Sequence, residues 1–173
     1  MAPPSSESGS RDGAAIAVTW TVDHARVAAE GGPDDAGVRR VVAAALREGG
    51  RDGVELSVVL VDDPTLTELH RVCLGDPSPT DVMSFDLGDE DAGPVGEVIV
   101  SVDRARAVAK ERGVPFAREL ALYLAHGTLH LCGHDDGDEG ARAAMRVAER
   151  RVLDSLGFAP DDAPHDVDPV SES

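Results

Sequence analysis

A stretch of fourteen residues from Leu120 to Gly133 contains no Asp, Glu, Lys or Arg. Apolar residues fall on every side of this segment, which is typical of a helix buried in a protein core. His126 and His130 lie within it, four residues apart, so both imidazoles leave the same helix face and can share one metal ion. Buried imidazoles need polar partners, and a metal ion satisfies both at once. The stretch therefore predicts a metal site on a central, buried helix.

The residues after this helix offer a third ligand. Gly133 supplies the permissive backbone that ends a helix and reverses the chain. His134, Asp135 and Asp136 follow directly. The turn can carry any of these side chains back over the two histidines, so the spacing alone leaves the third ligand open.

The length and charge of the chain limit its domain organisation and its possible partners. The chain has 173 residues and a formal net charge of −17, which taken alone argues against a nucleic-acid partner. Residues 1–14 are rich in Ser, Gly and Pro and are expected to be disordered, as is the acidic tail over residues 159–173. We expect a single domain over residues 15–158. No signal peptide or membrane-spanning run is evident, so a cytoplasmic protein without membrane contact is expected.

Hydrophobic periodicity and helix-capping residues predict nine elements. Together they indicate an α+β domain, in which a small four-stranded mixed sheet is covered by about five helices. The nearly all-apolar second half of the second strand predicts a central position in the sheet. The predicted strands cover residues 15–22, 54–61, 81–87 and 95–101; the predicted helices cover residues 36–48, a short segment from Asp63, and residues 102–112, 115–132 and 138–156.

Two sequence blocks carry a resemblance to a known family. The first is HGTLHLCGHDD, residues 126–136, and the second is PTDVMSF, residues 79–85, with Arg71 upstream and Gly96-Glu97-Val98 downstream. The chain resembles the YbeY family of bacterial rRNA maturation factors, single-strand-specific, metal-dependent endoribonucleases. The resemblance covers roughly residues 15–158 and implies a YbeY-like nuclease domain with a metzincin-like metal site on the buried helix and its following turn.

The resemblance also implies a ligand set. The family holds its metal with three histidines, and the last of these is Asp136 in this chain, while a family tyrosine is His134. Position favours His126, His130 and Asp136 as ligands, with His134 as the fallback. A carboxylate is an acceptable zinc ligand beside two imidazoles, so one Zn²⁺ is expected, with another divalent metal as the alternative.

Three protein ligands leave one coordination position open for water, whose pKa a metal ion lowers. Arg71 is the candidate for binding a phosphate or stabilising transition-state charge. In HExxH metalloproteases the residue after the first histidine is the general base, but here it is Gly127. Asp135 and Asp81 are candidate bases, and neither is preferred over a substrate phosphate or a second water.

Several other polar residues allow both a functional and a purely structural interpretation. Glu119 is either a carboxylate supporting a ligand imidazole or an ordinary first-turn acid. Thr80 and Asp81 bond local backbone at the strand start, or Asp81 and Ser84 shape the floor of a cleft. The densest basic run, Arg104, Arg106, Lys110 and Arg112, either faces rRNA or is a solvated helix face.

The sequence thus predicts an endoribonuclease that acts in rRNA maturation, at the 3′ end of 16S rRNA, and in ribosome quality control. Its expected partners are rRNA in the small ribosomal subunit and ribosome-associated proteins. One alternative is a zinc metalloprotease of the HxxxHxxGxxD type, which Gly127 disfavours. The other is a non-catalytic ribosome-assembly factor, which the absent third histidine and the −17 charge keep open.

Overall fold

The computed structural model describes residues 16–88 and 93–159, which fold as six helices and four strands. All nine predicted elements are present in the predicted order, so the α+β fold class is confirmed. The predicted tails lie outside the described residues, apart from Ala159. The strands are β1 (Ile16–Trp20), β2 (Leu56–Val61), β3 (Val82–Asp86) and β4 (Gly96–Ser101); the helices are α1 (His24–Ala29), α2 (Asp35–Glu48), α3 (Asp63–Leu74), α4 (Val102–Arg112), α5 (Phe116–Leu131) and α6 (Glu139–Ser155).

Helix α1 is the element that the sequence analysis missed. Its N-cap is Asp23, whose carboxylate accepts hydrogen bonds from the backbone N–H groups of Ala25 and Arg26. It has six residues, of which Val27 alone is buried. A single buried position cannot establish a helical period, so the cap residue was its only signal.

The four strands form one mixed sheet in the order β1-β2-β4-β3. β1, β2 and β4 run parallel, and β3 pairs antiparallel with β4, with Ser84 opposite Val98. The central position predicted for β2 is confirmed, and Val58 and Leu60 in it have no exposed surface. Parallel strands need a long connection, and here α1 and α2 lie in the connection from β1 to β2, while α3 and β3 lie in the connection from β2 to β4.

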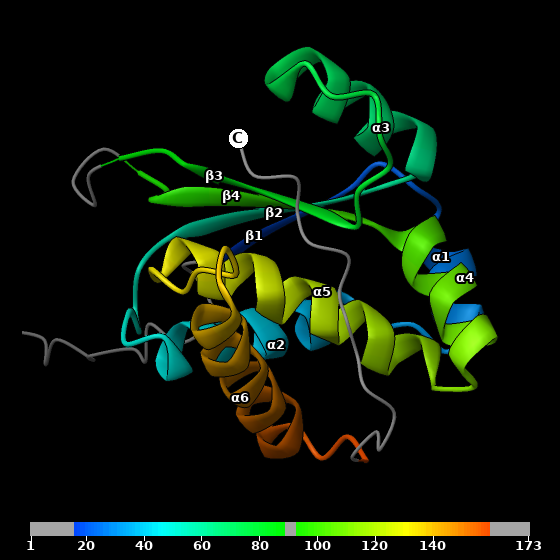
Figure 1. Cartoon of the computed structure of the whole chain (residues 1–173). Helices are drawn as coiled ribbons and strands as arrows, with labels where there is room; N and C mark the ends of the chain where they lie inside the picture. Colours follow the sequence, from blue (N-terminus) through cyan, green and yellow to red (C-terminus); the bar gives the residue numbers. More distant parts are fainter. Residues whose placement is uncertain (1–15, 89–92, 160–173) are drawn as a thin grey trace, which may run out of the picture.

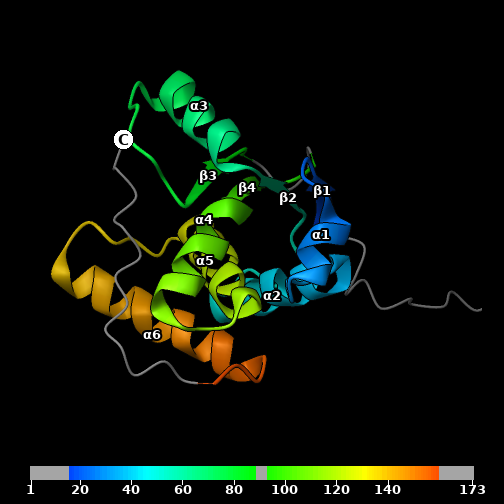
Figure 2. The ribbon, with the colours of Figure 1, turned by 90° about the vertical axis from the view of Figure 1, so that its right-hand side faces the viewer.

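The sheet separates two layers of helices (Figure 1). Helices α2 and α5 pack on one face, and α6 packs on the far side of α5 and α2. Helix α3 covers the opposite face, as the rotated view in Figure 2 also shows. A separate apolar cluster, Val61, Leu66, Met83 and Ile99, lies under α3.

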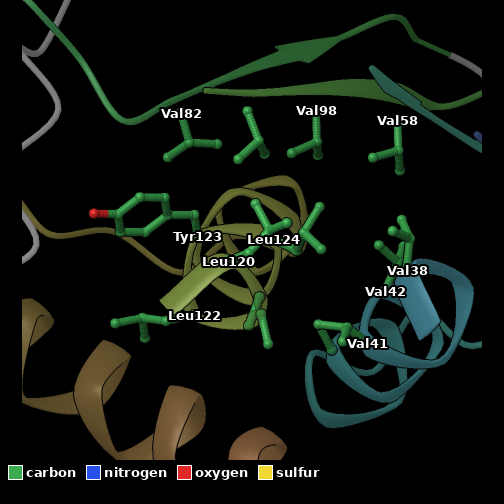
Figure 3. Close-up of a cluster of buried hydrophobic side chains, with 14 of the residues drawn as sticks. Val38, Val41, Val42, Val58, Val82, Val98, Leu120, Leu122, Tyr123 and Leu124 are labelled. Carbon is green, nitrogen blue, oxygen red and sulfur yellow. The ribbon is translucent and has the colours of Figure 1, made fainter. Parts of the chain in front are cut away.

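Helix α5 occupies the centre of the main core. Figure 3 shows Val82 and Val98 pointing from the sheet toward α5 and Val58 pointing toward α2, with Leu122 on the α6 side. Every residue of α5 from Phe116 to Leu129 except Ala117 is buried. Each Leu side chain buried in this way contributes about 1.5–3 kcal/mol, and the sheet and the helices α2, α4 and α6 all pack against α5.

None of the helices in residues 16–88 and 93–159 is both long and apolar enough to cross a membrane.

Candidate metal centre

Three side chains converge at the C-terminal end of α5. His126 and His130 approach each other edge to face, with 3.1 Å between their Nε2 atoms. Oδ2 of Asp136 lies 3.5 Å from each of these nitrogens. We call His126, His130 and Asp136 the metal triad; it is the group of potential ligands found among the described residues.

The spacing of the triad atoms fits one metal ion. Two ligand atoms bound at the usual ~2.0–2.1 Å to a tetrahedral zinc ion lie about 3.3 Å apart. The observed separations of 3.1, 3.5 and 3.5 Å are close to this value. Two imidazole nitrogens and one carboxylate oxygen also form a donor set suited to a divalent metal. The triad could therefore bind a metal through one triangular face of its coordination shell.

The turn after α5 brings Asp136 to the histidines. Gly133 has a φ of 96°, in the left-handed region that favours glycine. The Asp135 carboxylate accepts hydrogen bonds from the backbone N–H groups of Asp136 and Gly137. Arg142 of α6 donates to the backbone carbonyl of Asp136 at 3.2 Å. These contacts fix the backbone on which the Asp136 side chain is carried.

His134 occupies a different place in the same turn. Its backbone N–H donates to the carbonyl of Leu129, and its side chain is half-buried. The structure groups Asp136, not His134, with the two histidines.

The second nitrogen of His126 is held by a residue that the sequence analysis missed. Nδ1 of His126 donates to Oε1 of Glu149 at 2.6 Å, and both side chains are buried. This hydrogen bond fixes the tautomer in which Nε2 faces the triad. Glu149 lies on α6, 23 residues further along the chain. Its only sequence signal was an acid within the apolar face of a helix.

Glu119, the residue considered for this supporting role, lies elsewhere. It is fully buried and lies 3.9 Å from the Arg112 guanidinium. Burial raises the pKa of Glu119, although Arg112 and Tyr123 act in the opposite direction. Among the two carboxylates, therefore, Glu149 is the one that supports a triad imidazole.

The triad titrates as a coupled group. Burial alone would lower the pKa of His126, but Asp136 and Glu149 together outweigh it and raise this pKa to about 9. Burial and the charge of His126 lower the pKa of His130. The hydrogen bond from His126 is the largest cause of the lowered pKa of Asp136. The site thus concentrates negative charge, which attracts a cation.

The packing around Gly127 leaves no room for a side chain directly after His126. A Cβ at this position would lie 2.8 Å from methyl groups of both Val82 and Val98. Ser84 of β3 also donates to the Gly127 carbonyl at 2.7 Å. The sheet therefore fills the space that the glutamate of an HExxH motif would need.

The polar residues of the second sequence block, residues 79–85, make different kinds of contact in the structure. Ser84 contacts α5 as described, whereas the Thr80 hydroxyl donates to the Val82 carbonyl within its own segment. Asp81 is buried and pairs with Arg104 of α4 at 2.8 Å. Thr80 thus bonds local backbone, and of these three residues Ser84 is the one that contacts the metal-bearing helix.

Arg71 lies on α3, which the sheet separates from α5 (Figure 2). Its exposed guanidinium pairs with Glu68 one turn earlier, at 2.5 Å. The described contacts of Arg71 do not connect it to the triad. Its role in phosphate binding stays a prediction.

Comparison with known proteins agrees with the geometry. The family described as Endoribonuclease YbeY matches residues 33–157. A protein of Carboxydothermus hydrogenoformans named Endoribonuclease YbeY is 40% identical over 122 residues, covering 70% of this chain and 85% of the relative. Its namesake from Symbiobacterium thermophilum is 40% identical over 134 residues, covering 70% and 86%.

The fold has a solved counterpart. The solution structure of a Thermotoga maritima protein superposes with a TM-score of 0.54 at 23% identity, covering 82% of this chain and 91% of that one. At this identity the likeness concerns the fold. With the family match over residues 33–157 and the two relatives above, it leads to one conclusion: the chain belongs to the YbeY endoribonuclease family.

Proposed function

We propose that this protein is a metal-dependent endoribonuclease that cleaves single-stranded RNA during rRNA maturation, at the 3′ end of 16S rRNA, and in ribosome quality control. The observation that carries the proposal is the convergence of His126, His130 and Asp136 in a chain of the YbeY endoribonuclease family. Its substrate would be rRNA of the small ribosomal subunit, met in the cytoplasm together with ribosome-associated proteins.

The proposed ligands are the three members of the metal triad, and the proposed metal is one zinc ion. A bound metal ion supplies a Lewis acid for a phosphoryl oxygen and lowers the pKa of a bound water. Glu149 orients His126, and the Asp135 turn with Arg142 positions Asp136. Arg71 remains the candidate for binding a phosphate of the substrate.

The two acids considered as general base both have structural partners. Asp135 accepts two backbone N–H groups of the turn, and Asp81 pairs with Arg104. Gly127 has no side chain, and a glutamate there would collide with Val82 and Val98. This arrangement supports phosphodiester hydrolysis over the metalloprotease alternative, since the protease base is missing.

The proposal is tested by metal content and RNA cleavage measured on the same preparations. We expect about one metal ion per chain in the wild type and in His134→Ala, and loss of both metal and cleavage in Asp136→Ala. Loss of metal in His134→Ala but not in Asp136→Ala would contradict the ligand assignment.

Two further measurements separate the alternative functions. Proteolysis of casein that EDTA abolishes, with single-stranded RNA left intact, would support a protease. Full complementation of an rRNA-maturation defect by His126→Ala would support a non-catalytic assembly factor instead.

A further inference from the structure

Helix α6 carries three arginines in a row, Arg142, Arg146 and Arg150, which we call the arginine row. They are spaced by four residues, so each lies about 6 Å further along the axis and about 40° further round the helix. All three side chains are exposed. The row borders the buried face of α6 that includes Glu149, the residue in contact with His126.

The first member of the row touches the metal centre. Nη1 of Arg142 donates to the backbone carbonyl of Asp136, six residues earlier. A guanidinium has five N–H donors, so four remain after this bond. The acceptor is a neutral carbonyl, which leaves the positive charge of Arg142 uncompensated. In residues 16–88 and 93–159, no carboxylate forms an ion pair with Arg142 or Arg150.

The arginines of α4 differ in this respect. They belong to the basic run for which contact with rRNA was one of two expectations. Their side chains are less than one-third exposed, and each forms an ion pair with an acid. The pairs are Arg104–Asp81, Arg106–Asp103 and Arg112–Glu119. Much of the positive charge of α4 is therefore neutralised within the protein, whereas Arg142 presents its positive charge beside the triad.

We propose that the arginine row is a phosphate-binding track that guides a single RNA strand to the metal triad. This inference rests on the proposed nuclease function. The planar guanidinium group binds phosphate oxygens in a two-point geometry, independently of base identity. The row extends about 12 Å from Arg142 to Arg150, so it contacts several phosphates of one strand. It also accounts for how a chain with a net charge of −17 binds a polyanion, through a local basic surface.

The test uses the double variant Arg146→Gln/Arg150→Gln, which leaves Arg142 and its bond to Asp136 intact. The matched control is Arg47→Gln/Arg151→Gln, which removes the same charge. Arg47 and Arg151 are 69% and 68% exposed, and Arg151 pairs with Glu48 rather than belonging to the row. Equal metal content and equal melting temperatures would show that both variants fold around the same site.

The measurement is binding of a short, labelled single-stranded RNA by the metal-loaded proteins over a series of salt concentrations. Each phosphate contact with a single strand contributes about 0.7 to the slope of log K against log salt, so losing two contacts lowers the slope by about 1.4. We expect this decrease, and slower cleavage at low RNA concentration, in the row variant alone.

Three results would overturn the inference. The first is a row variant with the affinity and salt slope of the wild type. The second is an equal loss in row and control variants, which indicates a general effect of net charge. The third is a wild type that neither binds nor cleaves RNA while carrying its metal, which removes the proposed nuclease function and the track with it.

Discussion

Nδ1 of His126 lies 2.6 Å from Oε1 of Glu149, and this buried hydrogen bond joins α5 to α6. It assigns Nε2 of His126 to the triad, because Nδ1 is already engaged. A ligand imidazole whose other nitrogen is held by a carboxylate is oriented before any metal arrives. The metal centre is thus built by two helices, although its two histidines belong to one.

Glu149→Gln is expected to lower metal affinity by about 10–100-fold, because the amide supports the imidazole less strongly than a carboxylate does. Competition with a chelator measures the affinity. Glu111→Gln, an exposed substitution on α4, serves as the control. Equal metal affinities in the two variants would show that Glu149 does not support the ligand.

Gly127→Ala is expected to destabilise the fold by about 1–3 kcal/mol, because its methyl group would overlap Val82 and Val98. Urea unfolding measures this cost. Gly140→Ala in α6 is the matched control, since a methyl group there meets only an Asp138 oxygen at 3.4 Å. Alanine favours a helix over glycine by about 1 kcal/mol, so the control should be at least as stable as the wild type. The prediction fails if both variants unfold alike.

Glu119→Gln is expected to make stability less dependent on pH. Burial raises the pKa of Glu119 above its ordinary value of 4.5, so the folded chain holds this proton more tightly than the unfolded chain. The wild-type free energy of unfolding therefore falls as pH rises from the unfolded pKa through the folded pKa. The variant lacks this titrating group. The difference in free energy of unfolding between variant and wild type should therefore increase, in favour of the variant, as pH rises between the unfolded and the folded pKa. Parallel stability curves for the two proteins, from urea unfolding at several pH values, would contradict the assignment.

Arg71→Gln is expected to raise the KM for RNA cleavage without changing the melting temperature, if this residue binds a substrate phosphate. Arg26→Gln provides a close control, because Arg26 is also exposed and also pairs with a nearby glutamate, Glu30 at the C-cap of α1. Steady-state cleavage of single-stranded RNA measures the difference. Identical KM values for the two variants would remove Arg71 from the site.

Much of the fold could be predicted because burial imposes a period on the sequence. Helix α2 and strand β2 show this period over many residues, whereas α1 has one buried residue and shows none. The two histidines were visible because their spacing is local. Asp136 and His134 were equally near in sequence, and only the fold of the turn places the Asp136 carboxylate 3.5 Å from each of the two histidine nitrogens.

Contacts between helices could not be predicted from local pattern. Glu149 contacts His126, which lies 23 residues earlier in the chain. Nothing in the local sequence around Glu149 indicates this partner. The same holds for Arg104, whose pairing with Asp81 depends on how α4 lies against the start of β3. Such pairings follow from the packing of whole elements, which the sequence specifies only through the complete core.

Helix α6 is joined to the triad at two points, the Glu149 side chain on His126 and the Arg142 side chain on the Asp136 carbonyl. A displacement of α6 would disturb two ligands together, so ligand geometry and helix docking form one thermodynamic unit. Metal binding then stabilises the docked helix by mass action. Conversely, a substitution such as Met145→Ala, in the buried face of α6 and outside the triad, would weaken the docking of α6. The metal centre would then lose its metal to chelators more readily.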